Sequence, residues 1–185
     1  MGEPGTKEIL SLEELEAAGN FRSGRKHIVS ILVENKPGVL TRVTGLFARR
    51  GFNLNTLAVG PTDDDSVSRI TITLDGAVHS IDQVTKQLHK LINVLKIRDL
   101  EPEETLAREL ALFKISADGV GRAEVMQICD IFRAHIVDVS KRAVVAEVTG
   151  TQEKVDAFER LIRPFGLIEM ARTGEIAIGR GRNET

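Results

Sequence analysis

The sequence predicts an α+β fold made of two tandem modules, each with the order strand, helix, strand, strand, helix, strand. Three observations predict this fold. Short runs of apolar and β-branched residues are typical of strands, and between them apolar residues recur at helical spacing. The same order of elements occurs twice along a chain of 185 residues, a length that fits one large domain or two small ones.

The first module is expected over residues 27–101. Its four strands are predicted within residues 27–33, 54–59, 69–74 and 94–97. Two helices are predicted from apolar residues on one face, which are Val39, Val43, Leu46 and Phe47 in the first helix and Ile81, Val84, Leu88 and Leu91 in the second. This order is the split pattern of ferredoxin-like folds.

The second module is expected over residues 107–182, after a boundary at Glu101–Glu104. Its strands are predicted within residues 112–115, 136–139, 144–148 and 167–170. The helical apolar positions are Val125, Ile128, Cys129 and Phe132, and then Val155, Phe158 and Ile162. The repeat is one of element order and not of sequence. Each module is small enough to have a marginal core of its own, so we expect mutual packing or oligomerisation.

The first strand also predicts oligomerisation. It is apolar on nearly both faces, with Val29, Ile31 and Val33 on one and Ile28 and Leu32 on the other. One layer of helices covers only one face, and an apolar face left in water would form an aggregation-prone patch. We therefore expect a homodimer or a larger assembly.

Residues 1–26 differ from the rest and are expected to form a flexible extension. Within them Ser11 and Glu14 fit a capping box, in which each side chain bonds the backbone of the other residue. This predicts a short helix through Ala18 that stops at Gly19.

The composition excludes several classes of protein. A formal charge of −2 argues against a strongly basic nucleic-acid footprint, and seven Phe with no Trp or Tyr leave few platforms for stacking bases. The single cysteine, Cys129, excludes an intrachain disulfide framework and a multi-thiolate metal site. No apolar run approaches the ~18–20 residues of a membrane span, and no signal pattern opens the chain. We expect a cytoplasmic protein with no nucleic-acid or membrane partner.

The sequence contains no catalytic or metal-binding constellation. None of the four histidines forms the i, i+4 pair with a nearby Glu that a helical metal site shows. Cys129 belongs to an apolar helical stripe, which indicates a core position. The acidic run Asp63–Asp65 favours a hairpin turn over a cation site, because Asp suits turns and no glutamate follows at calcium-loop spacing.

One segment, Glu34–Leu40, has the features of a ligand site. A central strand ends there, the chain turns, and a helix begins at about Gly38. A helix start offers unpaired N–H groups and a positive dipole end, which together attract an anion. Gly38 permits close approach to the backbone, and Asn35 supplies a carboxamide that both donates and accepts. These features suit a zwitterion that carries a carboxylate and an ammonium.

The residues around this turn indicate a small ligand. Val39 and Leu40 are apolar, which favours a small aliphatic amino acid over a sugar or a nucleotide. Asn53 follows the same helix, and from a neighbouring copy of the chain its side chain would complete the pocket. The same pattern also occurs as plain turn chemistry, so the residues alone leave both interpretations open.

The Glu34–Leu40 run, followed by Phe47, Gly51 and Asn53, resembles an ACT domain, a regulatory amino-acid-binding module. From His27 to about Arg182 the chain resembles the small regulatory subunit of acetolactate synthase. The matching runs lie at residues 60–64, 68–72 and 86–91 in the first half and at 108–112, 132–139 and 171–174 in the second.

This resemblance implies a non-catalytic subunit. It implies activation of a separate catalytic large subunit that uses thiamine diphosphate, Mg²⁺ and FAD, so this chain itself holds no cofactor and no metal. It also implies feedback inhibition by valine, sometimes with leucine or isoleucine, bound between two ACT domains of a dimer. The effector positions carried over from the family are Asn35, Gly38, Val39, Leu40 and Asn53.

Arg172 and Arg180, in the basic tail, are weaker candidates for docking the catalytic subunit. The alternative function is an amino-acid-binding ACT regulator of another biosynthetic enzyme. An acyl-phosphate hydrolase on the same fold needs an arginine in the phosphate loop; the Asn35–Leu40 turn has none, and Arg42 lies one turn into the helix. An RNA-binding module needs exposed aromatics on its central strands, and a transcription factor needs a helix-turn-helix; neither is evident.

Overall fold

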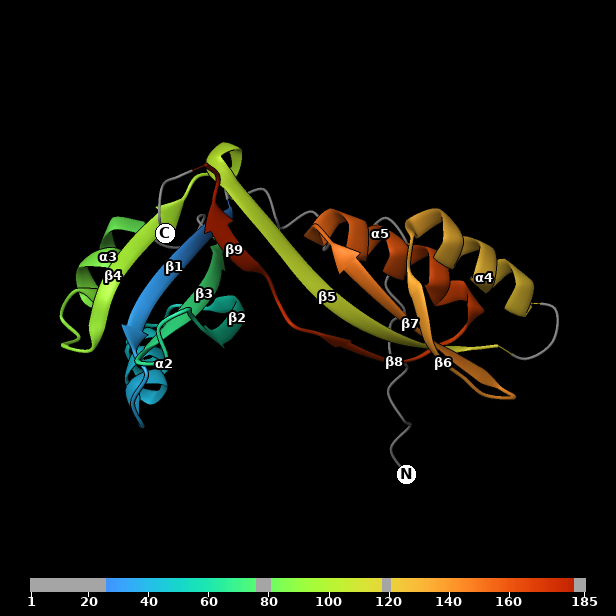
Figure 1. The fold of residues 1–185 in the computed structure, drawn as a ribbon, viewed down its shortest axis with the longest axis horizontal. Helices are drawn as coiled ribbons and strands as arrows, with labels where there is room; N and C mark the ends of the chain where they lie inside the picture. Colours follow the sequence, from blue (N-terminus) through green and yellow to red (C-terminus); the bar gives the residue numbers. More distant parts are fainter. Residues whose placement is uncertain (1–25, 76–80, 118–120, 182–185) are drawn as a thin grey trace, which may run out of the picture.

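The computed structural model describes residues 26–75, 81–117 and 121–181. The chain forms two sheets, each with a pair of helices, and the long strand β5 connects the two halves (Figure 1). The predicted extension with its Ser11 helix lies outside the described residues. Over the described ranges no helix is both long and apolar enough to cross a lipid bilayer.

The first half is a four-stranded antiparallel sheet with the order β2-β3-β1-β4. Its elements are β1 Lys26–Glu34, α2 Val39–Arg49, β2 Leu54–Pro61, β3 Val67–Asp75, α3 Ile81–Leu88 and β4 Val94–Leu100. Every predicted strand and helix of this module is present in the predicted order.

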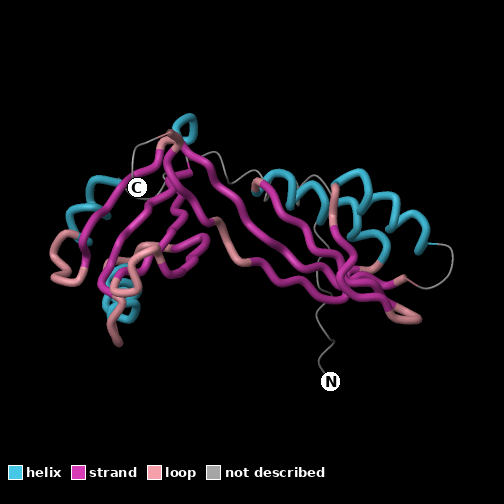
Figure 2. Tube along the Cα trace, in the orientation of Figure 1, coloured by secondary structure: helices cyan, strands magenta, loops and turns pink. Residues whose placement is uncertain are grey.

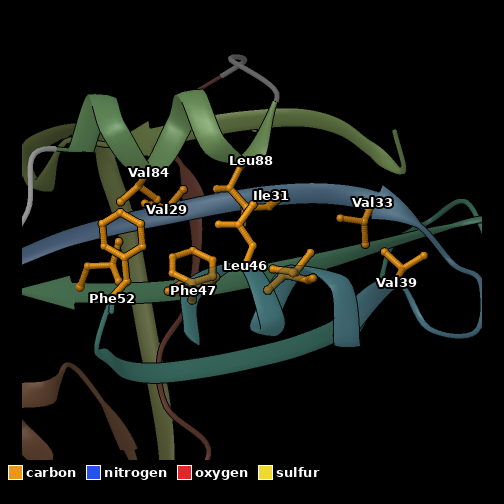
Figure 3. Close-up of a cluster of buried hydrophobic side chains, with 13 residues drawn as sticks. Val29, Ile31, Val33, Val39, Leu46, Phe47, Phe52, Val84 and Leu88 are labelled. Atoms are coloured by element: carbon orange, nitrogen blue, oxygen red, sulfur yellow. The ribbon is translucent and has the colours of Figure 1, made fainter. Parts of the chain in front are cut away.

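The core of this first module lies between the sheet and its two helices (Figure 3). Val29, Ile31 and Val33 alternate along β1 and all point to the helical side. They meet the apolar face of α2, whose buried residues are the four that the helical spacing predicts. Because strand side chains alternate between faces, the intervening residues Ile28, Ser30 and Leu32 lie on the opposite face of the sheet.

The second half repeats this order and confirms the predicted fold class. Its strands β5 Thr105–Ser116, β6 His135–Val139, β7 Ala143–Gly150 and β8 Leu167–Arg172 form a sheet in the order β6-β7-β5-β8. Two helices, α4 Gly121–Phe132 and α5 Gln152–Ile162, pack on it with a core of their own. Short 3₁₀ turns occupy Pro102–Glu104 and Arg163–Phe165. The two modules therefore have separate hydrophobic cores.

The sequence did not predict the ninth strand, β9 Ile176–Gly179, or the full length of β5. The first four residues of β5, from Thr105 to Arg108, pair with β9, while its later residues pair with β7 and β8. Figure 2 shows this extended ribbon running between the two halves. β9 has four residues, three apolar ones followed by a glycine, which is a weak strand signal without its partner.

Residues 173–180, here called the arm, connect the second module to the first. Ala177 of β9 is buried against Ile28 and Leu100 of the first sheet. Gly174 packs so closely on β2 that a Cβ there would lie 2.8 Å from Thr56 Cβ, and its φ of 76° is also unfavourable for other residues. The arm therefore covers one end of the sheet face that carries no helices.

The arm buries part of the apolar sheet face from which we predicted a dimer. Ile28, which we expected a second copy to cover, is buried by the arm of its own chain. Leu32, farther along the same face, is only half-buried. The assembly state itself stays a prediction.

Phe158 tests the packing of the second core. It is fully buried, and its ring lies 5.1 Å from that of Phe113 and 5.5 Å from that of Phe132. Phe158→Ala should lower the free energy of unfolding by about 3–5 kcal/mol, through lost contacts and a cavity. The exposed Ile131→Ala should stay within about 0.5 kcal/mol of the parent. Urea unfolding measures both, and equal effects would contradict this packing.

Candidate functional site

The turn between β1 and α2 is exposed. Residues 35–38 all lie on the surface. Gly38 is the N-cap of α2 and has a left-handed backbone with φ 82°, which favours glycine. The space that a Cβ would occupy at Gly38 is empty, so the backbone here is open to a ligand.

Unpaired N–H groups lie at the start of α2. Val39 N donates to Lys36 O at 3.3 Å, and Arg42 N donates to Gly38 O at 3.1 Å. Among the described residues, the N–H groups of Leu40 and Thr41 have no backbone acceptor. Such donors, together with the helix dipole, favour a negative group at this end of the helix.

Asn35 is held by the β2–β3 hairpin. Its backbone N donates to Ser66 O at 2.7 Å, and its Nδ2 donates to Asp65 O at 2.9 Å. Within the described part of the chain its Oδ1 accepts no hydrogen bond. The carboxamide is thus oriented by one bond and keeps an acceptor for a ligand.

The acidic run beside it is a turn, as predicted. Asp64 Oδ1 accepts hydrogen bonds from Ser66 N at 2.8 Å and Ser66 Oγ at 2.7 Å, and these bonds lower the pKa of Asp64. Thr62 Oγ1 donates to Asp64 O at 3.0 Å. No group of three or more His, Cys, Asp or Glu side chains that could hold a metal ion occurs among the described residues.

A second anchor of the turn comes from a residue that the sequence analysis did not single out. Asn93, just before β4, accepts a hydrogen bond from Arg42 through Oδ1 at 2.8 Å and donates from Nδ2 to Glu34. Its carbonyl also accepts from Glu34 N at 3.0 Å. The bonds from Asn93, followed by that from Lys36, lower the pKa of Glu34. No local pattern identifies Asn93, because its partners are distant in sequence.

The two apolar residues of the predicted pocket separate in the structure. The side chain of Val39 is 4% exposed and packs in the first core, whereas Leu40 is 42% exposed. Our expectation that both line a pocket is therefore not met for the Val39 side chain. Val39 supports the turn from inside, and Leu40 is the apolar residue available at the surface.

Asn53 is also exposed, but it lies beyond the other end of α2. The helix has 11 residues, which at about 1.5 Å per residue spans roughly 16 Å. One chain therefore does not bring Asn35 and Asn53 together, and a pocket that uses both needs a second copy.

The thiol and a cavity between the two modules lie away from this turn. Burial raises the pKa of Cys129, which sits in the second core as predicted, so it is not an activated nucleophile. This cavity has a volume of about 570 Å³. It is lined by Lys26, Asn55, Thr56, Leu57, Thr73, Glu109, Gln152, Glu153, Asp156, Arg172, Thr173, Gly174 and Glu175.

Comparison with known proteins identifies the family. Residues 29–96 match a family model described as an AHAS small subunit-like ACT domain, and residues 108–181 match one described as the small subunit of acetolactate synthase. A probable acetolactate synthase small subunit from Methanothermobacter thermautotrophicus is 52% identical over 156 residues, covering 84% of this chain and 93% of that protein. The chain belongs to the acetolactate synthase small-subunit family.

Two further relatives agree with this assignment. A probable acetolactate synthase small subunit from Archaeoglobus fulgidus is 48% identical over 159 residues, covering 86% of this chain and 99% of that protein. The crystal structure of the acetolactate synthase small subunit from Thermotoga maritima has a TM-score of 0.80 and 41% identity, covering 86% of this chain and 99% of that one. A small subunit implies a large catalytic subunit as its partner.

The two arginines that we expected to dock this large subunit have partners within the chain. Arg172 donates from Nη1 to Asp156 at 2.7 Å and from Nη2 to Glu109, whose side chain is only 2% exposed. Arg180 donates from Nε to Thr105 O at 3.2 Å, and its backbone N bonds Glu104 O. Both therefore hold the small subunit together, and docking through them stays a prediction.

Arg172→Met tests this internal role. It leaves the buried Glu109 carboxylate without its cation and should destabilise the chain by about 3–5 kcal/mol. Arg160 is exposed, so Arg160→Met is the matched control and should change stability by less than about 0.5 kcal/mol. Thermal unfolding at neutral pH compares the two. Unchanged stability of the Arg172 variant would show that the guanidinium is available to a partner instead.

Proposed function

We propose that this small subunit is the non-catalytic regulator of an acetolactate synthase. It activates the large catalytic subunit and confers feedback inhibition by a small aliphatic amino acid, with valine first and leucine or isoleucine next. The observation that supports the effector site best is the open, glycine-capped start of α2, where unpaired N–H groups lie beside Asn35.

The turn offers a complementary group for each part of such an effector. The N–H groups of Leu40 and Thr41 suit the carboxylate, because they are unpaired donors at the positive end of a helix. The Oδ1 atom of Asn35 suits the ammonium as an acceptor. Leu40 supplies an apolar contact for the aliphatic side chain.

A second copy of the chain completes this site in our proposal. Asn53 of the second copy would reach the effector bound at the α2 start of the first, because the two ends of the helix are too far apart within one chain. A homodimer or larger assembly then carries one effector site at each such contact. The thiamine diphosphate, Mg²⁺ and FAD belong to the large subunit, and this chain needs none of them.

Reconstitution tests the function as a whole. The purified chain alone should form no acetolactate from pyruvate, because no catalytic constellation is present in its sequence. Mixed with its large subunit, it should raise the rate of acetolactate formation and bring sensitivity to valine. Robust turnover by this chain alone, or an unchanged rate in the mixture, would contradict the regulatory assignment.

Asn35→Ala tests the effector site. It removes a hydrogen bond to a charged ligand group, worth about 1.5–3 kcal/mol, so the valine concentration for half inhibition should rise about 10- to 150-fold. Activation of the large subunit should remain, since the turn is at the surface and the α2 core is untouched.

Asp64→Ala is the matched control for this experiment. It loosens the same hairpin by removing the bonds to Ser66 but leaves the Asn35 carboxamide in place. Its half-inhibition concentration should change by less than about threefold, below 0.7 kcal/mol. If both variants shift equally, Asn35 acts only through the hairpin; if Asn35→Ala abolishes activation in a folded chain, the turn contacts the large subunit.

A further inference from the structure

The sheet face of the first module that carries no helices is basic. Residues that lie opposite one another on β4, β1, β3 and β2 form a row across the sheet, and all four side-chain positions of a row lie on the same face. One row contains Lys96, Leu32, Arg69 and Gly60, and the next contains Arg98, Ser30, Thr71 and Ala58. These two rows contain three basic residues, Lys96, Arg69 and Arg98, and Arg69 donates to Ser30 Oγ at 3.0 Å. We call the two rows the basic face; the arm covers the row that follows.

An apolar groove of about 340 Å³ lies beside the basic face. One wall is formed by residues 58–61 of β2 with Arg69 and Thr71, and the other by the β5–β9 ribbon with Leu106, Arg108 and residues 176–178. Ile176 and Ile178 are 61% and 50% exposed. Large apolar side chains exposed together in a groove mark a docking surface, and here an arginine lies on each wall.

We propose that residues 8–18 of the same chain dock in this groove. Their sequence contains four glutamates, no lysine or arginine, and the apolar residues Ile9, Leu10, Leu12 and Leu15. In the predicted capping box, Leu10 precedes the N-cap and Leu15 is the fourth helical residue, the two positions of a hydrophobic staple. An acidic and leucine-rich segment complements an apolar groove flanked by Arg69 and Arg108.

The connection to the rest of the chain is long enough. Lys26, the first residue of β1, forms an ion pair with Glu175, and Glu175 directly precedes Ile176 of the groove. The chain therefore enters its fold beside the groove. The seven residues 19–25 span up to about 23 Å when extended, at about 3.3 Å each. Docking within one chain also benefits from the high effective concentration that a short tether gives.

Disulfide cross-linking in the full chain tests this docking. Leu15→Cys is combined with Ile178→Cys in the groove, and as a control with Ile92→Cys, which replaces a side chain that is 88% exposed and lies outside the groove. The native Cys129 is buried and does not compete. The groove pair should close an intrachain disulfide at least about tenfold faster than the control pair, at a rate independent of protein concentration.

Two further experiments test the role of charge in docking and whether the docked segment comes from the same chain. Arg108→Glu should slow closure of the groove pair several-fold, because it replaces a cation of the groove by a carboxylate facing an acidic segment. Equal rates for the groove and control pairs would overturn the proposal. So would equally fast cross-linking between a chain that carries only Leu15→Cys and one that carries only Ile178→Cys, which would assign the groove to a second copy.

Discussion

Each module covers only one face of its sheet with helices, and this constraint governs the rest of the molecule. In the first module α2 and α3 bury the face that contains Val29 and Ile31. The opposite face holds Ile28, which cannot remain in water without cost. The arm packs on Ile28, so the segment that connects the two modules also buries this apolar residue of the first sheet. The apolar groove beside Arg69 and Arg108 is the surface that we propose for the N-terminal segment.

The position of the helices on one face of the sheet also explains why the effector turn is accessible. The turn lies at the end of β1, outside the layer of helices, and its stability comes from Asn93 on one side and the Asp65 hairpin on the other. The glycine at its centre supplies a backbone conformation that few residues adopt and leaves the helix N–H groups exposed. The turn is thus held by hydrogen bonds on two sides and is exposed where we propose that the effector binds.

The sequence predicted what depends on local periodicity and failed where pairing is long-range. Alternation and helical spacing placed all eight strands and four helices of the two modules, because each element buries one regular stripe. β9 was missed because its four residues are too few to show a strand pattern, and they form a strand only through pairing with the distant β5. Asn93 and the Arg172–Glu109 pair were missed as internal contacts for the same reason. Val39 was predicted both as an effector position and as part of the α2 stripe; its side chain lies in the core, and its role at the effector site stays a prediction.

In our proposal the start of α2 recognises the carboxylate of a small aliphatic amino acid. Titration calorimetry of the full chain with valine and with valinol, which lacks the carboxylate, tests it directly. Valine should bind saturably, and valinol should bind at least about tenfold more weakly, because charged hydrogen bonds worth roughly 1.5–3 kcal/mol are lost. Equal affinity for valine and valinol, or no saturable binding of valine, leucine or isoleucine, would contradict this carboxylate site.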